Sequence, residues 1–189
     1  SSDLLQDAKL VPGQYDVVVS NVPFADVSIA DARIRYGIKM SLHNYYLARM
    51  ADLVKPGGIV AAITTHYSMD AVVKDAVKMR EHLASQMQFL GGVRLPNNAF
   101  KDNAGTAVVT DVLFFKKPLV ARGYGKEFRL SEPVKIEGGM AERAETEEAV
   151  AHVNEYFLDH PEMVLGSHVV GHGMYSANEY SVKSKDGAD

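Results

Sequence analysis

The stretch YDVVVSNVPFADV, residues 15–27, places an amide, a proline and an aromatic ring directly after an apolar run. The amide is Asn21, and Val22, Pro23 and Phe24 follow it. The side-chain oxygen of Asn21 and a backbone carbonyl turned aside by the proline can accept both hydrogens of a planar amino group. The ring of Phe24 offers a face on which a flat base can stack, a contact worth about 1 to 3 kcal/mol.

An aromatic amine is a poor nucleophile because its lone pair is delocalised into the ring. Two acceptors aimed at its hydrogens favour the pyramidal geometry of attack through electrostatic preorganisation, so that no strong base is needed. The same four residues also recur by chance, because an Asn-x-Pro turn often ends a strand for structural reasons. The motif leaves a catalytic and a structural interpretation open.

Composition narrows the class of protein. The chain has 189 residues, of which 47% are hydrophobic, and this is enough for one sizeable core with an appendage. It has no cysteine, which excludes disulfides, thiolate metal sites and a thiol nucleophile. The net charge of -4 argues against non-specific nucleic-acid binding by the whole surface. No apolar run is long enough for a membrane span and no leader opens the chain, so we expect a cytoplasmic protein without a membrane partner.

The elements that must position the motif alternate between strand and helix. We expect a strand over 15–20, a helix over 42–54, a strand over 58–65 and a helix over 70–87, with Asp70 as an acidic cap at the start of the last helix. The first strand should be buried on both faces, because its apolar run is unbroken. Ser41 is placed to cap the first helix, and KPGG at residues 55–58 ends it. This order predicts an α/β fold with a parallel sheet.

Two later strands, over 89–96 and 108–117, have no helix between them and should form an antiparallel hairpin at the sheet edge. We therefore divide the chain into residues 1–118 and an appendage, residues 119–189. The appendage is rich in Asp and Glu between residues 137 and 163, which predicts an acidic helix over about 141–159. Its polar end is expected to be a frayed, flexible tail.

The NVPF motif resembles the Asn-Pro-Pro-aromatic motif of amino-methyltransferases that use S-adenosylmethionine. Three further stretches, beginning SLHNYYLARM, LGGVRLPNNAF and VNEYFLDHPEM, look like successive blocks of adenine-specific DNA methylases. The likeness is closest to the large methylase-helicase proteins of phages and conjugative elements, and it covers roughly residues 3–175 in the same order. It implies a partial Rossmann-like methyltransferase fold that transfers a methyl group to the N6 amine of a flipped adenine.

Carried over by position, the resemblance implies that Asn21 and the carbonyl of Val22 accept hydrogen bonds from the target amine. Pro23 would shape the turn, and Phe24 would stack on the flipped base. Val22 stands where the family has proline. Any residue supplies a carbonyl, so the chemistry is retained and only rigidity before Pro23 is lost.

The resemblance also implies roles outside the motif. Asp3, in the sequence DLL, matches the acidic block that binds the cofactor adenine, although a solvated terminal Asp is the plain alternative. Phe100 stands where the family often has a second aromatic residue against the target base, or it closes the hairpin loop over the core. His66 follows the second strand and could line the pocket or simply lie in a rim loop. Tyr36 belongs to a long loop, residues 25–40, that we expect to order on substrate.

The family's Gly-rich cofactor turn does not appear before Asp3, and VVGHGMY at residues 169–175 is better explained as a loop. We therefore expect the C-terminal part of a methylase domain, with most of the S-adenosylmethionine site and an N-terminal half outside this chain. Alone it should bind the cofactor poorly and be inactive. Its expected partners are DNA, the missing half and a helicase domain in the same polypeptide.

Other readings remain open. The same motif serves glutamine amides of release factors and guanine amines of RNA, since all are planar nitrogen donors. A catalytically silent remnant that binds DNA or protein is the alternative from another class. The histidines His160, His168 and His172 do not predict a metal site, because their surroundings lack a helix and a ligand-spaced carboxylate.

Overall fold

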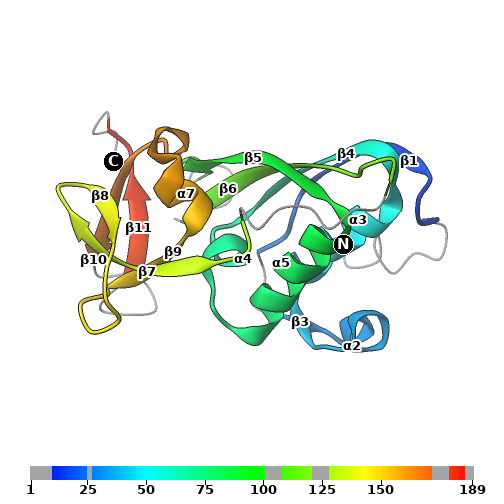
Figure 1. Ribbon diagram of the computed structural model, residues 1–189, viewed down its shortest axis with the longest axis horizontal. Helices are drawn as coiled ribbons and strands as arrows, with labels where there is room; N and C mark the ends of the chain where they lie inside the picture. The colour runs from blue at the N-terminus through cyan, green and yellow to red at the C-terminus, as the bar shows by residue number, and fades with distance from the viewer. Residues whose placement is uncertain (1–9, 25–26, 101–107, 121–127, 172–178, 186–189) are drawn as a thin grey trace.

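The main sheet of the protein has four strands in the order β1-β4-β6-β5 (Figure 1). The computed structural model describes residues 10–24, 27–100, 108–120, 128–171 and 179–185. The strands are β1 (Tyr15–Asn21), β4 (Val54–Thr65), β6 (Thr110–Lys116) and β5 (Gln88–Leu95). β1 and β4 are parallel, whereas β6 is antiparallel to both of its neighbours. The predicted fold class, a partial Rossmann-like α/β sheet with an antiparallel edge hairpin, is confirmed.

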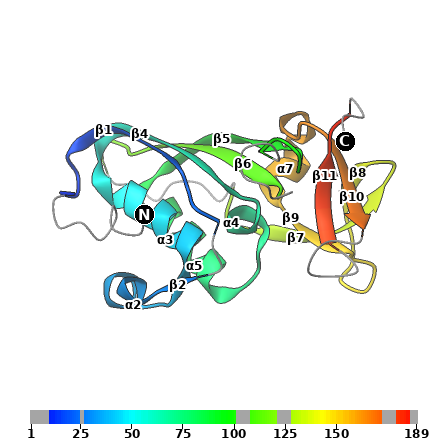
Figure 2. The same ribbon diagram turned by 180° about the vertical axis from the view of Figure 1, so that it is seen from behind.

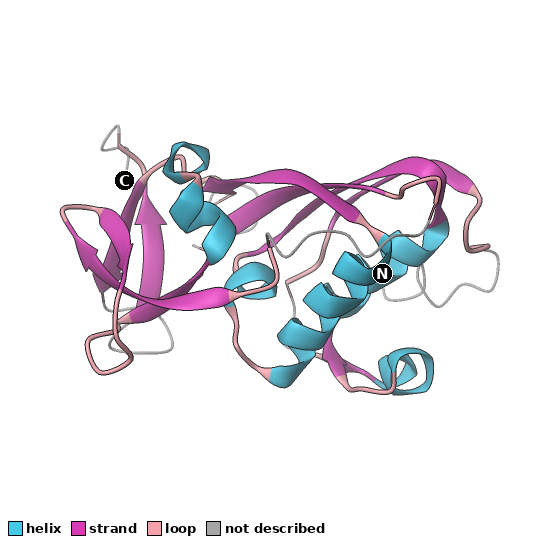
Figure 3. Cartoon of the chain, viewed as in Figure 1, coloured by secondary structure: helices cyan, strands magenta, loops and turns pink. Residues whose placement is uncertain are grey.

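Two helices, α3 (Leu42–Leu53) and α5 (Lys74–Gln86), lie side by side on one side of this sheet (Figure 3). α3 ends one residue before the predicted end, and its C-cap is Val54 in an extended conformation rather than a glycine of KPGG. β4 begins at Val54, so residues 55–58 belong to this strand, which starts earlier than the predicted 58–65. Gly57 of the predicted stop sequence has a φ of 85°, a left-handed conformation that glycine adopts easily. Ser41 is the N-cap residue but makes no capping bond through its side chain, and its backbone N–H donates to Asp75 at 3.1 Å.

The second predicted helix, over 70–87, is interrupted. A single turn, α4 (Tyr67–Asp70), precedes α5, which begins only at Lys74. The expected acidic cap is wrong, because Val73 is the N-cap residue and provides no side-chain cap. The carboxylate of Asp70 instead accepts hydrogen bonds from the buried Arg94.

The prediction that β1 is buried on both faces is also wrong. Val17 is 57% exposed and Val19 is 71% exposed, whereas Val18 between them is half-buried. β1 pairs with β4 alone among the described strands, so its other edge is free. An apolar run predicts burial only when other elements cover both faces and both edges of the strand.

The open face of β1 continues across the whole main sheet. Directly paired residues point their side chains to the same face, so Val19 shares its face with Ala61 of β4 and Phe114 of β6. The apolar side chains on this open face are all exposed or half-buried: Val17, Val19, Ile59, Ala61, Ile63, Val112, Phe114, Val93 and Leu95. The opposite face carries buried residues such as Val60 and Leu113 and receives the helices. The sheet is therefore covered on one side and open on the other.

The segment between β1 and α3 contains β2 (Ser28–Ile29), α2 (Ala30–Tyr36) and β3 (Met40–Ser41). β2 and β3 form a short antiparallel pair, and α2 ends at Gly37, whose φ of 71° is left-handed. The described part of the expected loop over 25–40 thus contains a helix, while residues 25–26 lie outside the described residues.

The C-terminal part forms two small antiparallel sheets rather than the predicted acidic helix over 141–159 (Figure 2). One consists of β7 (Ser131–Glu137), β8 (Met140–Arg143) and β9 (Ala151–Asn154), and the other of β10 (Ser167–Gly171) and β11 (Glu179–Lys183). Among the described residues of this part, the helical elements are α7 (Glu155–Asp159) and the 3-10 turn η1 (Pro161–Met163). The acidic composition favours exposure but does not fix the period of the backbone, and residues 140–143 and 151–154 satisfy their backbone groups by strand pairing.

Aromatic packing attaches this part to the main sheet. Phe89 of β5 lies 5.2 Å from Phe115, 4.9 Å from Phe128 and 4.9 Å from Tyr156, measured between ring centroids. The expected frayed tail is wrong for residues 181–183, which belong to β11 with Val182 fully buried, while residues 186–189 lie outside the described residues. The division of the chain at residue 118 stays a prediction.

Candidate active site

The motif residues Asn21 to Phe24 lie where β1 leaves the sheet. Asn21 is the last residue of β1 and pairs with Ile63 of β4. Val22 donates its backbone N–H to the carbonyl of Ile63 at 2.8 Å, and its side chain is 1% exposed. Because strand side chains alternate between faces, the burial of Val22 turns Asn21 outward. Asn21 and Phe24 are both exposed, so an amide and an aromatic ring are presented together at the end of the strand.

The carboxyl ends of three strands meet at this edge. β5 is antiparallel to β6, and β6 is antiparallel to β4, so β5 runs in the same direction as β1 and β4. His66 follows directly after β4, and Phe100 lies in the turn after β5, where it is half-buried. Ligands of open α/β sheets bind at such carboxyl ends. The fold therefore places Asn21, His66 and Phe100 on the same edge.

Tyr36 lies elsewhere. Its hydroxyl donates to Asp52 at 2.7 Å, and its ring packs edge-on against His82 at 4.9 Å. Burial and the bond to Asp52 raise the pKa of the Tyr36 hydroxyl. The carbonyl of Asp52 accepts from Gly13, just before β1 begins, so Tyr36 lies toward the opposite end of β1 from Asn21. Asp3 lies outside the described residues.

His66 is held in place by a carboxylate. It is 6% exposed, and its Nδ1 lies 3.1 Å from Asp70 Oδ2. Burial raises the pKa of Asp70, but Arg94 and His66 outweigh it and hold that pKa at about 2. An ionised Asp70 accepts a hydrogen bond from Nδ1 of His66, which fixes the orientation of the imidazole ring. The imidazole ring also stacks on Tyr67, with ring centroids 4.1 Å apart.

A buried ion cluster behind His66 centres on Arg94. Arg94 is fully buried and donates to Asp111 through Nε and Nη2, both at 2.8 Å, and to Asp70 at 2.8 and 2.9 Å. It also donates to the hydroxyl of Tyr180 at 3.1 Å. Although burial lowers it, the pKa of Arg94 is raised by both carboxylates, so the guanidinium is charged. One buried guanidinium is thus paired with two buried carboxyl groups.

This buried ion cluster joins two strands of the main sheet, the turn α4 and the C-terminal strands. Arg94 lies on β5, Asp111 on β6 and Asp70 at the end of α4. The backbone N–H of Asn154 donates to Asp70 at 2.9 Å, which adds β9. Tyr180 of β11 lies 2.8 Å from Nδ1 of His168, so the C-terminal strands are included as well.

The sequence contained a signal for this cluster. Arg94 and Asp111 interrupt two otherwise apolar strands, and they are paired directly across β5 and β6. Opposite charges inside neighbouring buried strands indicate a buried ion pair, because an isolated buried charge is strongly unfavourable. The contribution of Asp70 lacked such a signal, since it depends on the turn α4 that separates it from α5.

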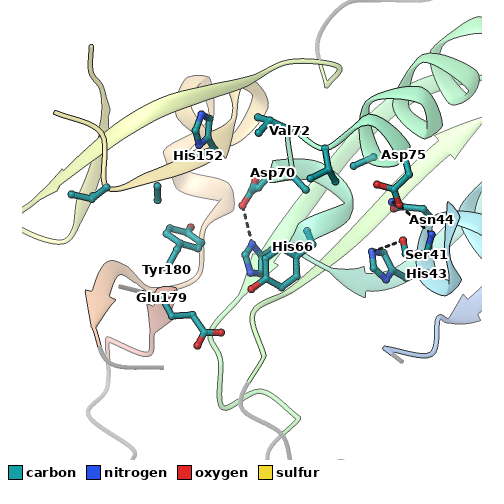
Figure 4. A pocket seen from close by; sticks show the side chains of 16 residues that line it. Ser41, His43, Asn44, His66, Asp70, Val72, Asp75, His152, Glu179 and Tyr180 are labelled. Atoms are coloured by element: carbon teal, nitrogen blue, oxygen red, sulfur yellow. Dashed lines mark hydrogen bonds and ion pairs between the residues drawn. The ribbon is translucent and has the colours of Figure 1, made fainter. Parts of the chain in front are cut away.

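A cavity of about 500 Å³ lies beside His66 (Figure 4). One wall comes from the starts of α3 and α5 and from the segment after β4, and the other wall from β9 and β11. Asn44, Asp75, His66, His152, Glu179 and Tyr180 are among the residues that line it. The cavity thus lies between the sheet with its helices and the C-terminal strands.

The described residues offer neither a cluster of metal ligands nor a membrane-spanning helix. They contain no group of three or more His, Asp or Glu side chains arranged to hold a metal ion. No helix in this part of the chain has the length and apolar composition for crossing a membrane.

Comparison with known proteins gives one sequence relative. No family model matches the chain. The "Defense against restriction protein B" of Escherichia phage P1 is 32% identical over 104 residues. The match covers 54% of this chain and 4% of that protein, so the chain spans a small part of its relative.

Two solved structures are similar to this chain at low sequence identity. A structure described as the basis of complex assembly and conformational transition in the type I R-M system matches with a TM-score of 0.50 and 16% identity. The match covers 84% of this chain and 30% of that chain. The M protein of the type I restriction enzyme EcoKI matches with a TM-score of 0.49 and 19% identity, over 66% of this chain and 25% of that chain. The first match shows a fold shared over most of this chain.

Proposed function

We propose that this chain is the target-binding part of a DNA methyltransferase that moves a methyl group from S-adenosylmethionine to N6 of adenine. One observation carries the proposal: Asn21 and Phe24 are exposed together at the carboxyl end of a parallel strand, while Val22 between them is buried. This arrangement presents a carboxamide and a ring at the edge where α/β sheets bind ligands. The match to a type I R-M structure supports a restriction-modification context.

In this proposal the residues of the motif bind and orient the target. The side-chain oxygen of Asn21 and the carbonyl of Val22 accept the two hydrogens of the amine, and Phe24 stacks on the flipped base. The acceptors stabilise the positive charge that develops on the nitrogen. Val22 is fixed by its bond to Ile63 and by burial, which restores the rigidity that a second proline would supply.

The open face of the sheet supports the proposal that an N-terminal half of the methyltransferase domain lies outside this chain. Val17 and Val19 are more than half exposed, and the free edge of β1 presents unpaired backbone groups next to them. A parallel strand with an exposed apolar face is rare, because parallel sheets are normally covered on both faces. We infer that further strands of the same sheet pair with β1 and that their helices cover its open face.

The cofactor belongs to that missing half. The described residues near Asn21 include no glycine-rich turn after a strand, so they do not fit S-adenosylmethionine by themselves. We therefore assign to this chain only the binding and orientation of the acceptor. DNA and a helicase domain in the same polypeptide remain proposed partners, and inactivity of this chain alone remains part of the proposal.

The test measures transfer of labelled methyl groups to DNA by the full-length protein that contains this chain. We expect Asn21→Ala to lower the rate by about 100-fold, as for loss of one preorganised electrostatic contact. The matched control is Gln88→Ala, which removes an exposed carboxamide at the opposite end of the sheet. Equal rates for the two variants would contradict the catalytic role of Asn21.

Three methyl acceptors, tested in the same assay, distinguish the proposed function from its alternatives. Labelled product on DNA adenine supports the proposal, whereas label on a protein glutamine or on guanine in RNA supports another planar nitrogen donor. No transfer to any of them, with folded protein and cofactor present, would favour a silent remnant.

A further inference from the structure

A small basic hollow lies on the segment that follows the motif. It has a volume of about 300 Å³ and is lined by Ser28, Ile29, Ala30, Arg33 and Lys39. These residues belong to β2, to α2 and to the position directly before β3. The basic hollow shares no lining residue with the cavity beside His66. It is therefore a separate feature of the surface.

The segment that carries the basic hollow is packed onto the helices. β2 and β3 pair with each other, and Ile29 and Met40 in this pair are buried. Both short strands contact α3, on the helix side of the main sheet (Figure 2). The hydroxyl of Tyr45 on α3 donates to Asp31 of α2. These contacts fix the place of the basic hollow relative to the sheet.

The basic hollow lies close to the target base proposed at the motif. Ser28 is four residues after Phe24, so their Cα atoms are at most about 14 Å apart, at about 3.5 Å per residue. One strand of DNA carries a phosphate about every 3.4 Å along the helix axis. The phosphates next to a base held at Phe24 thus fall within this distance.

The two basic side chains of the hollow are open to a ligand. Arg33 and Lys39 are exposed, and within the described residues neither forms an ion pair or a side-chain hydrogen bond. The nearby Asp31 does not neutralise them, because its carboxylate is bonded to Arg35 and Tyr45. None of the described residues that line the hollow is acidic. Two uncompensated positive charges beside one hollow attract an anion.

The cavity beside His66 has the opposite charge. Its lining includes Asp75 and Glu179 but, among the described residues, no Lys or Arg (Figure 4). β3 separates the two, since Lys39 before it lines the basic hollow and Ser41 within it lines the cavity. A polyanion is attracted to the first side and repelled from the second. Charge therefore favours a path for the DNA backbone over the basic hollow.

We propose that Arg33 and Lys39 bind backbone phosphates of the DNA strand that carries the target adenine. The inference rests on the proposed function and adds where the DNA lies, with its backbone over β2 and α2 and away from the cavity beside His66. Arg33 offers a planar fork of donors to phosphate oxygens, and Lys39 offers a point charge. Such contacts fix the register of the DNA and carry no sequence information.

The test measures binding of duplex DNA to the full-length protein that contains this chain, by fluorescence anisotropy at a series of salt concentrations. The variant combines Arg33→Gln with Lys39→Gln. Each neutralised phosphate contributes about 0.9 to the slope of log K against log salt, so we expect the slope to decrease by about 2. The same relation predicts a roughly 50-fold loss of affinity at about 0.1 M salt. Wild-type affinity and slope in this variant would overturn the proposal.

The matched control combines Arg35→Gln with Lys78→Gln. It removes the same number of charges from exposed side chains, but these are already paired with Asp31 and Glu81, and neither lines the basic hollow. We expect the control to bind DNA more nearly like the wild type. Equal losses in the two double variants would assign the effect to net charge alone and overturn the proposal. Thermal unfolding of both variants verifies that the fold is retained.

Two unrelated DNA sequences of equal length separate phosphate contacts from base contacts. The Arg33 and Lys39 variant should weaken binding to both by the same factor, because phosphate contacts do not depend on sequence. A loss confined to one sequence would place these side chains on base edges and overturn the proposal. Weaker binding of inorganic pyrophosphate with unchanged binding of DNA would assign the basic hollow to a free anion and equally overturn it.

The outcomes also separate this inference from the proposed function. Unchanged DNA binding by the variant, in a protein whose wild type methylates adenine, contradicts the inference alone. Absence of both DNA binding and methyl transfer in the wild-type protein contradicts the proposed function together with the inference.

Discussion

The motif at the end of β1 and the buried ion cluster around Arg94 use polar groups in opposite ways. Asn21 is exposed and has no hydrogen bond from its side chain to another described residue. Arg94 is fully buried and makes five hydrogen bonds to Asp70, Asp111 and Tyr180. Polar groups that are saturated within the protein stabilise a structure, whereas groups left open at a strand end are available to a ligand. Both lie near the same edge of the sheet, so position alone does not separate the two uses.

The largest expected effect is on stability, at the ion cluster. Arg94→Ala leaves Asp70 and Asp111 buried without their cation, and we expect the free energy of unfolding to fall by about 3 to 5 kcal/mol. Urea denaturation measures it. Arg35→Ala, which removes an exposed ion pair with Asp31, is the control and should cost less than about 1 kcal/mol. A similar small loss for both variants would show that the cluster does not hold the strands together.

Asn21→Ala should have the opposite pattern, with a small effect on stability and a large effect on methyl transfer. Since its amide is exposed, we expect the free energy of unfolding to change by less than about 0.5 kcal/mol, while methyl transfer by the full-length protein falls about 100-fold. Urea denaturation and the transfer assay are run on the same preparation. A large loss of stability would indicate a structural turn, and the motif would then resemble the ion cluster.

Acid should lower the free energy of unfolding through groups at and beside the buried ion cluster. Burial and the nearby Arg94 lower the pKa of His168 to about 4, below the ordinary value near 6.5. Between these pH values the unfolded chain binds more protons than the folded one, so stability falls as the pH decreases from 6.5 to 4, by on the order of 2 kcal/mol. Asp70, with its pKa held at about 2, adds a further loss below about pH 4, which the pKa of Asp111, raised by burial, partly opposes.

The measurement is urea denaturation at a series of pH values. His168→Asn should flatten the curve between pH 6.5 and 4, because the titrating ring is gone. An unchanged slope in this variant would exclude His168 as the cause.

The smallest expected effect on this chain is at the open face of the sheet. Val19→Thr replaces an exposed side chain and should change the free energy of unfolding by less than about 0.5 kcal/mol. The same change should weaken association with the proposed missing half, which pull-down of separately expressed halves measures. Val11→Thr, also exposed but before β1, is the matched control. Equal association of both variants would argue against this face as the docking surface.

Much of the main sheet was predictable because its signals are local. The apolar run at 15–20 and the helical spacing at 42–54 each act within one element, and the structure confirms both elements. The acidic helix predicted over 141–159 is wrong because acidic composition does not specify a helical period. The break between α4 and α5 has no local signal, because Asp70 pairs with Arg94, which lies 24 residues further along the chain.

The sequence by itself determined which chemical groups follow β1: an amide, a carbonyl, a proline and a ring, together with the resemblance that gives them a role. Only the tertiary structure decided which of these groups face outward, since this depends on the pairing of β1 with β4 and on the burial of Val22. It also decided that Arg94, Asp70 and Asp111 neutralise one another, and that Val17 and Val19 lie on an open face. The physical reason is that exposure and ion pairing are properties of contacts between distant segments, which residue types and local spacing do not specify.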